Sequence, residues 1–131
     1  MKELNTIGLD QEKAENLAKK LNTLLSNYSI FYQNTRGFHW NIQGDKFFEL
    51  HLKFEEIYND LLLKIDEIAE RILTLGYTPE HRYTEYSKSS TIKESDKVTD
   101  GHTAVAQILD SLKIVIVMQR AILELANDAN D

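Results

Sequence analysis

Apolar residues recur three and four positions apart through three long stretches of this chain, a spacing typical of α-helices that bury one face. We predict helices over residues 11–36, 47–75 and 101–127, with a short helical turn over 84–88 in the polar stretch between the last two. One proline in 131 residues leaves the long stretches uninterrupted. The sequence therefore predicts an all-α antiparallel helix bundle, formed by a single domain over residues 1–131.

Residues suited to helix ends flank the predicted helices. Asp10, Asp45 and Asp100 stand where an N-cap is expected. Gly76, followed by Pro79, marks the end of the second helix. These signals fix the helix boundaries without any reference to tertiary contacts.

The last predicted helix contains an apolar run over residues 114–118 that covers its whole circumference. A helix of this kind is normally buried on more than one side. Three long helices do not cover it, so we expect another helix or another subunit to pack there.

Five side chains are of types that bind transition metals: His39, His51, Glu55, Asp66 and Glu70. The chain has no cysteine, which excludes thiolate ligands, disulfides and cysteine nucleophiles. Imidazole combined with carboxylate suits iron, zinc or manganese better than copper(I). His39 falls in a predicted short turn between Gly37 and Gly44, from which its ring can reach a neighbouring site.

The other four candidates lie on one predicted helix, yet they cannot share one ion. The fifteen positions from His51 to Asp66 span roughly 22 Å along a helix axis. His51, Glu55, Asp66 and Glu70 nevertheless fall within an arc of roughly 100°, so one face carries two half-sites. An antiparallel copy that crosses near residues 60–62 brings each half-site to the other, which predicts a metal site completed by a two-fold dimer.

Ordinary surface salt bridges are the competing explanation for this charged face. Lys53, Lys64 and Arg71 lie near enough in the sequence to pair with the acids. The like-charged pair Asp66 and Glu70 favours a bound cation instead. The chain has neither a Glu-x-x-His motif nor a His-Glu-x-x-His motif, which argues against a standard di-iron bundle and a zinc protease.

Charge and hydropathy limit the partners. A net charge of −6, with the first twenty residues balanced, makes nucleic-acid binding through the whole surface a weakly supported expectation. No apolar run approaches the length of a membrane span, and the first residues lack the apolar core of a signal peptide. We expect a cytoplasmic protein with no membrane partner. His81 and His102 are expected at the surface or in capping roles.

A recognisable pattern surrounds the candidate ligands. It comprises residues 34–41 (Asn-Thr-Arg-Gly-Phe-His-Trp-Asn), Gly44, Phe47, Phe48, Leu50, His51, Phe54, Glu55, Tyr58, Asp66 and residues 68–72 (Ile-Ala-Glu-Arg-Ile). The pattern resembles the signature of the Dps family, the mini-ferritins, and the resemblance covers essentially the whole chain. It implies a ferritin-like bundle that assembles into a hollow dodecamer.

The resemblance also implies a function. Members of the family oxidise iron(II) with hydrogen peroxide or oxygen, store iron(III) inside the cage, and so protect DNA. By the matching motif, His39, His51 and Glu55 come from one chain, and Asp66 and Glu70 from its two-fold mate. Trp40 would lie beside the site, where it packs on the iron, quenches radicals or forms interface core.

Two departures from the family pattern stand out. The family usually has aspartate where this chain has Glu55. The chain also stops where the family enters its last long helix, so we expect the fourth helix to be missing and the chain to be C-terminally truncated. Asp128 and Asp131 match a region that helps line three-fold iron pores in the family, or else form a frayed terminus.

Two other functions are compatible with the sequence. One is a nucleoid-binding stress-protection protein in which the metal site is vestigial. The other is a helical interaction module whose apolar last helix recruits a partner.

Overall fold

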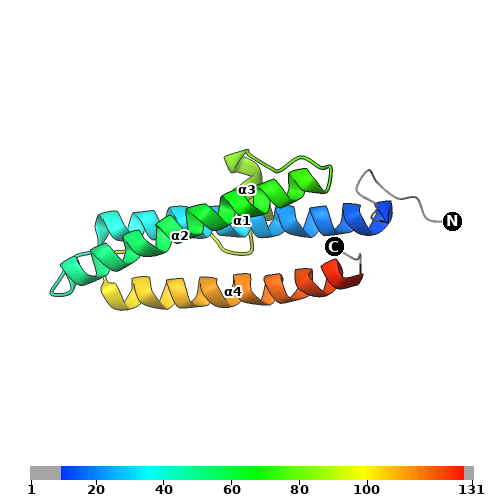
Figure 1. Ribbon diagram of the computed structural model, residues 1–131. Helices are drawn as coiled ribbons and strands as arrows, with labels where there is room; N and C mark the ends of the chain where they lie inside the picture. The colour runs from blue at the N-terminus through cyan, green and yellow to red at the C-terminus, as the bar shows by residue number, and fades with distance from the viewer. Residues whose placement is uncertain (1–9, 129–131) are drawn as a thin grey trace.

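The computed structural model describes residues 10–128, and every regular element in that range is a helix. The order is α1 (Gln11–Asn41), α2 (Phe47–Thr74), α3 (Tyr83–Ser89) and α4 (Gly101–Asp128). α1 is the central element, because it packs against each of the other three (Figure 1). α2 runs antiparallel to α1, and α4 runs in the same direction as α2 (Figure 1). The all-α helix bundle predicted from the sequence is therefore confirmed.

The expectation that a fourth helix is missing is wrong, since the described chain contains four helices. The polar stretch after α2 supplies one of them, α3, which extends the predicted turn over 84–88 by one residue at each end. The physical reason is that a polar segment, which has no apolar stripe to bury, still forms a helix when α1 lies alongside it.

The boundary of α1 also differs from the prediction. The helix continues through Gly37 to Asn41, so the predicted turn that contains His39 is instead the last turn of α1. Glycine inside a helix costs about 1 kcal/mol relative to alanine. Burial of Phe38 and His39 in this turn offsets that cost. Asp10 caps the start of α1 as predicted, by accepting hydrogen bonds from the backbone N–H groups of Glu12 and Lys13.

The ends of the other long helices agree with the sequence in part. Asp45 is not the N-cap of α2, because Lys46 occupies that position and makes no side-chain capping bond. Gly76 follows α2 with φ of +91°, a left-handed conformation that favours glycine, as predicted. Asp100 accepts hydrogen bonds from the backbone N–H and hydroxyl of Thr103, which confirms the predicted cap of α4. These bonds lower the pKa of Asp100.

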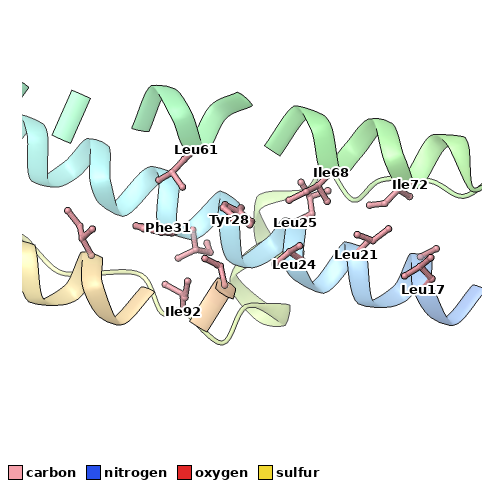
Figure 2. Close-up of a cluster of buried hydrophobic side chains, with 14 of the residues drawn as sticks. Leu17, Leu21, Leu24, Leu25, Tyr28, Phe31, Leu61, Ile68, Ile72 and Ile92 are labelled. Carbon is pink, nitrogen blue, oxygen red and sulfur yellow. The ribbon is translucent and has the colours of Figure 1, made fainter. Parts of the chain in front are cut away.

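A continuous apolar core lies between α1 and the helices that cover it (Figure 2). Each large aliphatic or aromatic side chain buried there stabilises the fold by about 1.5–3 kcal/mol. The core is drawn from α1, α2, α4 and the loop before α4. Figure 2 labels Leu17, Leu21, Leu24, Leu25, Tyr28, Phe31, Leu61, Ile68, Ile72 and Ile92.

Within this one chain, the apolar run in α4 is buried on one side only, so no other described helix packs on its outer side. Val115 is buried against the core, whereas Ile116 and Val117 are 44% and 60% exposed. The reason is that α4 packs against α1 but makes no comparable contact with α2 or α3 among the described residues. None of the described helices is both long enough and apolar enough to span a membrane.

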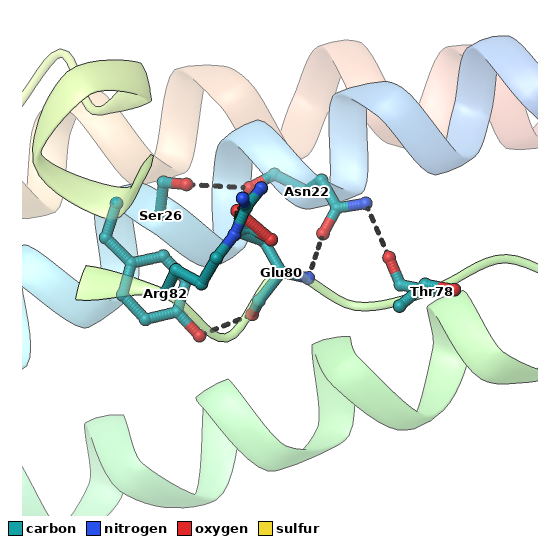
Figure 3. Close-up of polar contacts among 6 residues, drawn as sticks. Asn22, Ser26, Thr78, Glu80 and Arg82 are labelled. Carbon is teal, nitrogen blue, oxygen red and sulfur yellow. Dashed lines mark hydrogen bonds and ion pairs between the residues drawn. The ribbon is translucent and has the colours of Figure 1, made fainter. Parts of the chain in front are cut away.

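The connection between α2 and α4 runs back along α1, where asparagine side chains hold it. Asn22 donates from its side-chain amide to the carbonyl of Thr78 at 3.2 Å (Figure 3). Its side-chain oxygen accepts from the backbone N–H of Glu80 at 2.8 Å. The side-chain amide of Asn22 thus makes two hydrogen bonds to the backbone of the connection, one as donor and one as acceptor.

Asn27 and Asn34 also accept hydrogen bonds from the connection further along α1, and Asn34 donates to it as well, to the carbonyl of Lys93. Asn27 is fully buried, and its side-chain oxygen accepts from the backbone N–H groups of Thr91 and Ile92, each at 3.0 Å. Asn34 accepts from the backbone N–H of Ser95 at 2.9 Å. The connection is therefore fixed to one side of α1, while α2 packs on another part of the same helix.

Candidate metal centre

Two histidines meet where α1 ends and α2 begins. His39 lies on the last turn of α1 and His51 near the start of α2, and the short link between these helices brings them together. Their rings stack with centroids 3.6 Å apart and planes inclined by 19°. His39 is buried, with 7% of its surface exposed.

Each of the two rings is fixed by the backbone of the other residue. The Nδ1 atom of His39 lies 2.6 Å from the carbonyl oxygen of His51, and Nδ1 of His51 lies 2.7 Å from the carbonyl oxygen of His39. A carbonyl only accepts, so both Nδ1 atoms carry the hydrogen and donate it. In the neutral rings both Nε2 atoms therefore keep a lone pair, which is the form that binds a metal ion.

The position of His39 within α1 makes this exchange possible. The last carbonyls of a helix have no partner within the helix, and the carbonyl of His39 is one of them. The ring Nδ1–H of His51 donates to this carbonyl. The end of α1 thus orients the imidazole of His51, in the way that hydrogen-bond acceptors commonly orient metal-binding histidines.

Glu55 completes a group of three possible ligands. Its Oε1 atom lies 3.9 Å from Nε2 of His39, and one donor atom from each of His39, His51 and Glu55 lies within 4.8 Å of the others. Two ligand atoms on one ion at about 2.1 Å are at most about 4.2 Å apart. The side chain of Glu55 is 45% exposed and has room to make this small adjustment. Within residues 10–128 this is the one such group.

Aromatic rings enclose the histidine pair. Phe47 stacks on His51 with centroids 5.0 Å apart, and Tyr58 points its edge at His39 with centroids 5.3 Å apart. Sequence reasoning missed the role of Phe47, although its position four residues before His51 places both on one helix face. It also missed the two carbonyl bonds, for which no side-chain pattern exists.

Asp66 and Glu70 lie on the same helix but not in this group. Both are exposed, about 22 Å or more along α2 from His51. Exposed Leu62 and Leu73 flank them. The structure therefore brings together three of the five predicted ligands, His39, His51 and Glu55, and leaves Asp66 and Glu70 at the far part of α2.

More acidic side chains stand near Tyr28, in the middle of α1. Burial raises the pKa of the Tyr28 phenol, and the carboxylates of Asp60 and Glu67 raise it further, while a hydrogen bond with Gln119 opposes them. Asp60 and Glu67 are exposed. α2 thus carries negative charge along much of its length beyond the histidine pair.

The remaining candidates from the sequence lie at the surface. Trp40 is 56% exposed, with the guanidinium of Arg36 over its ring at 4.7 Å. His81 and His102 are exposed, as predicted. Asp128 is exposed at the end of α4, and Asp131 lies outside the described residues.

Comparisons with known proteins extend over nearly the whole chain. The profile of the ferritin-like domain family matches residues 18–131. The DNA protection during starvation protein of Porphyromonas gingivalis is 42% identical over 128 residues, covering 98% of this chain and 80% of the relative. An uncharacterized protein of Haemophilus influenzae is 52% identical over 126 residues, covering 96% and 79%.

A solved structure agrees with these relatives. The Dps protein from Vibrio cholerae O1, described as a member of a broad superfamily of ferritin-like diiron-carboxylate proteins, matches with a TM-score of 0.96 and 54% identity. The match covers 98% of this chain and 80% of that one. The histidine pair, Glu55 and the two distant acids all fall inside the region that these comparisons match.

Proposed function

Since this chain belongs to the ferritin-like family, as one of the Dps proteins, we propose that it oxidises iron(II) and stores the iron(III) produced. The observation that carries the proposal is the pair of locked imidazoles whose free nitrogens stand beside Glu55. Neutral imidazole and carboxylate together suit iron(II) and also tolerate iron(III). Iron is the substrate, and hydrogen peroxide or oxygen is the oxidant.

The reaction needs a complete ligand set, and one chain supplies half of it. His39, His51 and Glu55 bind iron(II) in one subunit, and Asp66 and Glu70 of the partner subunit complete the site. Carboxylates favour the rise in charge as iron is oxidised, because an anion close to a cation stabilises it. With peroxide the balance is 2 Fe2+ + H2O2 + 2 H+ → 2 Fe3+ + 2 H2O.

The assembly follows from the same requirement. Two chains related by a two-fold axis give two equivalent sites, one at each end of the paired α2 helices. We propose that six such pairs form a dodecameric cage, with acidic side chains on its inner surface receiving iron(III). Trp40 is placed beside the site, where it contacts the partner or intercepts radicals.

Protection of DNA does not require contact with DNA in this scheme. When the protein consumes iron(II) and peroxide together, they cannot react to form hydroxyl radical near DNA. A net charge of −6 fits this indirect role better than tight binding to phosphates. We place the protein in the cytoplasm.

Mixing two inactive variants tests the shared site. One variant carries His39→Ala and His51→Ala, and the other carries Asp66→Ala and Glu70→Ala. Each alone is expected to lose rapid iron(II) oxidation. In a mixed pair, one of the two sites combines an intact imidazole half with an intact acidic half. Random pairing of equal amounts restores about a quarter of the wild-type sites.

The readout is the rate of iron(III) formation after the variants are dissociated, mixed and reassembled. Recovery of activity supports a site shared between chains. No recovery, with assembly verified by ultracentrifugation, overturns it. If the Asp66→Ala, Glu70→Ala variant oxidises iron(II) rapidly without the other variant, these two acids are not ligands.

A further inference from the structure

Gly101, the first residue of α4, lies against the start of α2. A Cβ atom added at Gly101 would lie 2.7 Å from a terminal methyl carbon of Leu50 and 3.9 Å from one of Ile42. Carbon atoms in contact are about 3.5–4.0 Å apart, so the position beside Leu50 has no room for a side chain. Gly44 and Gly76 have positive φ angles and Gly101 does not, so glycine is needed here for space and not for backbone conformation.

The two residues that Gly101 approaches belong to the segments that carry the histidine pair. Leu50 directly precedes His51 and is half-buried against the core. Ile42 lies three residues after His39 and is 2% exposed. The end of α1, the start of α2 and the start of α4 all lie at one end of the bundle (Figure 1). The start of α4 therefore packs beside both segments.

A backbone hydrogen bond holds the link between α1 and α2 to the same place. The N–H of Gln43 donates to the carbonyl of Thr99, two residues before Gly101, at 2.9 Å. α4 is itself anchored next to this bond, because Ala104 and Ile108 are buried and the helix packs against α1. The start of α4 is thus held by its own contacts with α1, separately from the asparagine bonds that fix the connection before it.

The histidine pair depends on the distance between the end of α1 and the start of α2. Nδ1 of His51, on α2, lies 2.7 Å from the carbonyl oxygen of His39, on α1, and the reverse bond is 2.6 Å long. A methyl group at position 101 has to gain about 1 Å to reach contact distance from Leu50. If the first turn of α2 moves by that amount along the bond, the bond reaches the limit at which it still forms. The ring of His51 then loses the support that fixes its tautomer.

We infer that Gly101 is a positioning residue for the candidate metal centre. Because it has no side chain, the start of α4 closes on Leu50 and holds the first turns of α2 where the ring of His51 reaches the carbonyl of His39. The inference rests on the proposed function, in which His51 binds iron(II). It gives α4, which supplies none of the candidate ligands, a part in the site.

The first test needs no metal. Full-length, metal-free protein is labelled with nitrogen-15 at histidine, and solid-state NMR reports which ring nitrogen of His51 carries the hydrogen. The signals of His51 are identified by their loss in His51→Gln. Wild type is expected to show hydrogen on Nδ1 alone, and Gly101→Ala a mixture of the two tautomers. An unchanged His51 spectrum in Gly101→Ala means that Leu50 simply rotates away from the added methyl group, and it overturns the inference.

The second test measures binding of cobalt(II), a spectroscopic probe, to the full-length protein. Gly101→Ala is expected to weaken binding roughly tenfold, the lower end of what removal of an outer-shell support costs. Adding Leu50→Val to Gly101→Ala shortens the side chain that the new methyl group meets. The double variant should therefore recover most of the affinity and the wild-type tautomer of His51. If it recovers neither, the effect of Gly101→Ala does not pass through Leu50, and the inference is wrong.

Gly37→Ala is the matched control. Gly37 is also a helical glycine, two residues before His39, and a Cβ atom added there meets no atom within 4 Å. It should leave the His51 tautomer and the cobalt(II) affinity unchanged. An equal loss in Gly37→Ala means that any methyl group added near the pair disturbs it, and this too overturns the inference. Circular dichroism and urea unfolding verify that each variant is folded under the conditions of binding, so that weaker binding reflects the geometry of the site.

Failure of the proposed function can be distinguished from failure of the inference. If wild type does not oxidise iron(II), the proposed function fails. The tautomer of His51 in Gly101→Ala still decides whether Gly101 positions this ring, because that measurement contains no metal.

Discussion

The two ends of the candidate metal-binding face of α2 are constructed in different ways. At the start of the helix, the ring of His51 is fixed by a hydrogen bond to a backbone carbonyl and by stacking between His39 and Phe47. Towards the other end, Asp66 and Glu70 are exposed, and neither belongs to a group of converging donors among the described residues. One end is ordered before any metal or partner arrives, and the other is not.

The difference reflects what each type of ligand requires. An imidazole binds a metal only when one particular nitrogen has a free lone pair and points at the ion. Its tautomer and its orientation must both be fixed, and the chain does this with hydrogen bonds to the backbone. A carboxylate offers two equivalent oxygens and rotates freely, so it adapts when it meets the ion. In the proposed shared site, the ordered half is built within one chain, and the adaptable half comes from the partner.

Substituting the histidines should produce the largest effect and should separate the two ends. His51→Ala removes a candidate ligand and the ring that stacks on His39, but it leaves the backbone carbonyl that accepts from Nδ1 of His39. We expect cobalt(II), used as a spectroscopic probe on dissociated chains, to lose binding by more than the roughly 10- to 100-fold that removal of an outer-shell partner costs.

The contrasting variant is Asp66→Ala with Glu70→Ala, which should leave cobalt(II) binding by dissociated chains unchanged. A comparable loss from both variants in dissociated chains would show that the two ends of α2 cooperate within a single chain and are not independent. Sedimentation of each sample verifies that the chains are separate.

Substituting Asn27 should weaken the fold while sparing the ordered end of α2. Asn27→Ala removes the acceptor of two backbone N–H groups, those of Thr91, which is exposed, and of Ile92, which is buried. An unsatisfied buried donor costs about 1–3 kcal/mol, so we expect the free energy of unfolding, measured with urea, to fall by about 2–4 kcal/mol. Cobalt(II) binding by the folded fraction should persist, because α2 packs on α1 independently of this connection.

Asn34→Ala provides the matched comparison, since Asn34 makes the same type of bond to Ser95 but is less buried. Its cost should be smaller, because water can replace the lost partner. If both variants lose cobalt(II) binding in step with stability, the connection does help to position the histidines.

Much of the fold could be predicted because its long helices follow a simple period. The sequence predicted the unbroken α2, the caps Asp10 and Asp100, and the end of α2 at Gly76. These features depend on local chemistry, such as a side-chain oxygen that satisfies the first N–H groups of a helix. The spacing of the acids from His51 also follows from helix geometry alone.

The rest could not be predicted, since it depends on contacts between segments. Gly37 indicates a turn by its own propensity, yet α1 continues through it because Phe38 and His39 are buried against neighbouring helices. The support of each histidine comes from a carbonyl, which every residue has and no pattern identifies. The exposure of Ile116 reflects which helices pack on α4, and this is a property of the whole chain.

Shortening Glu55 should have the smallest effect. Glu55 belongs to the ordered end of α2 yet is itself an adaptable carboxylate. Glu55→Asp keeps the charge and retracts the carboxylate by about 1.5 Å, the length of one carbon–carbon bond. Half-exposed and unconstrained, the side chain can recover part of that distance by rotation. We expect cobalt(II) binding by dissociated chains to weaken by less than about tenfold, or about 1.4 kcal/mol.

Glu55→Gln keeps the length of the side chain and removes its charge, and should weaken cobalt(II) binding more. If the aspartate variant loses as much as the glutamine variant, the position of this carboxylate is as strictly required as that of the imidazoles, and the distinction between fixed rings and adaptable acids does not hold at this site.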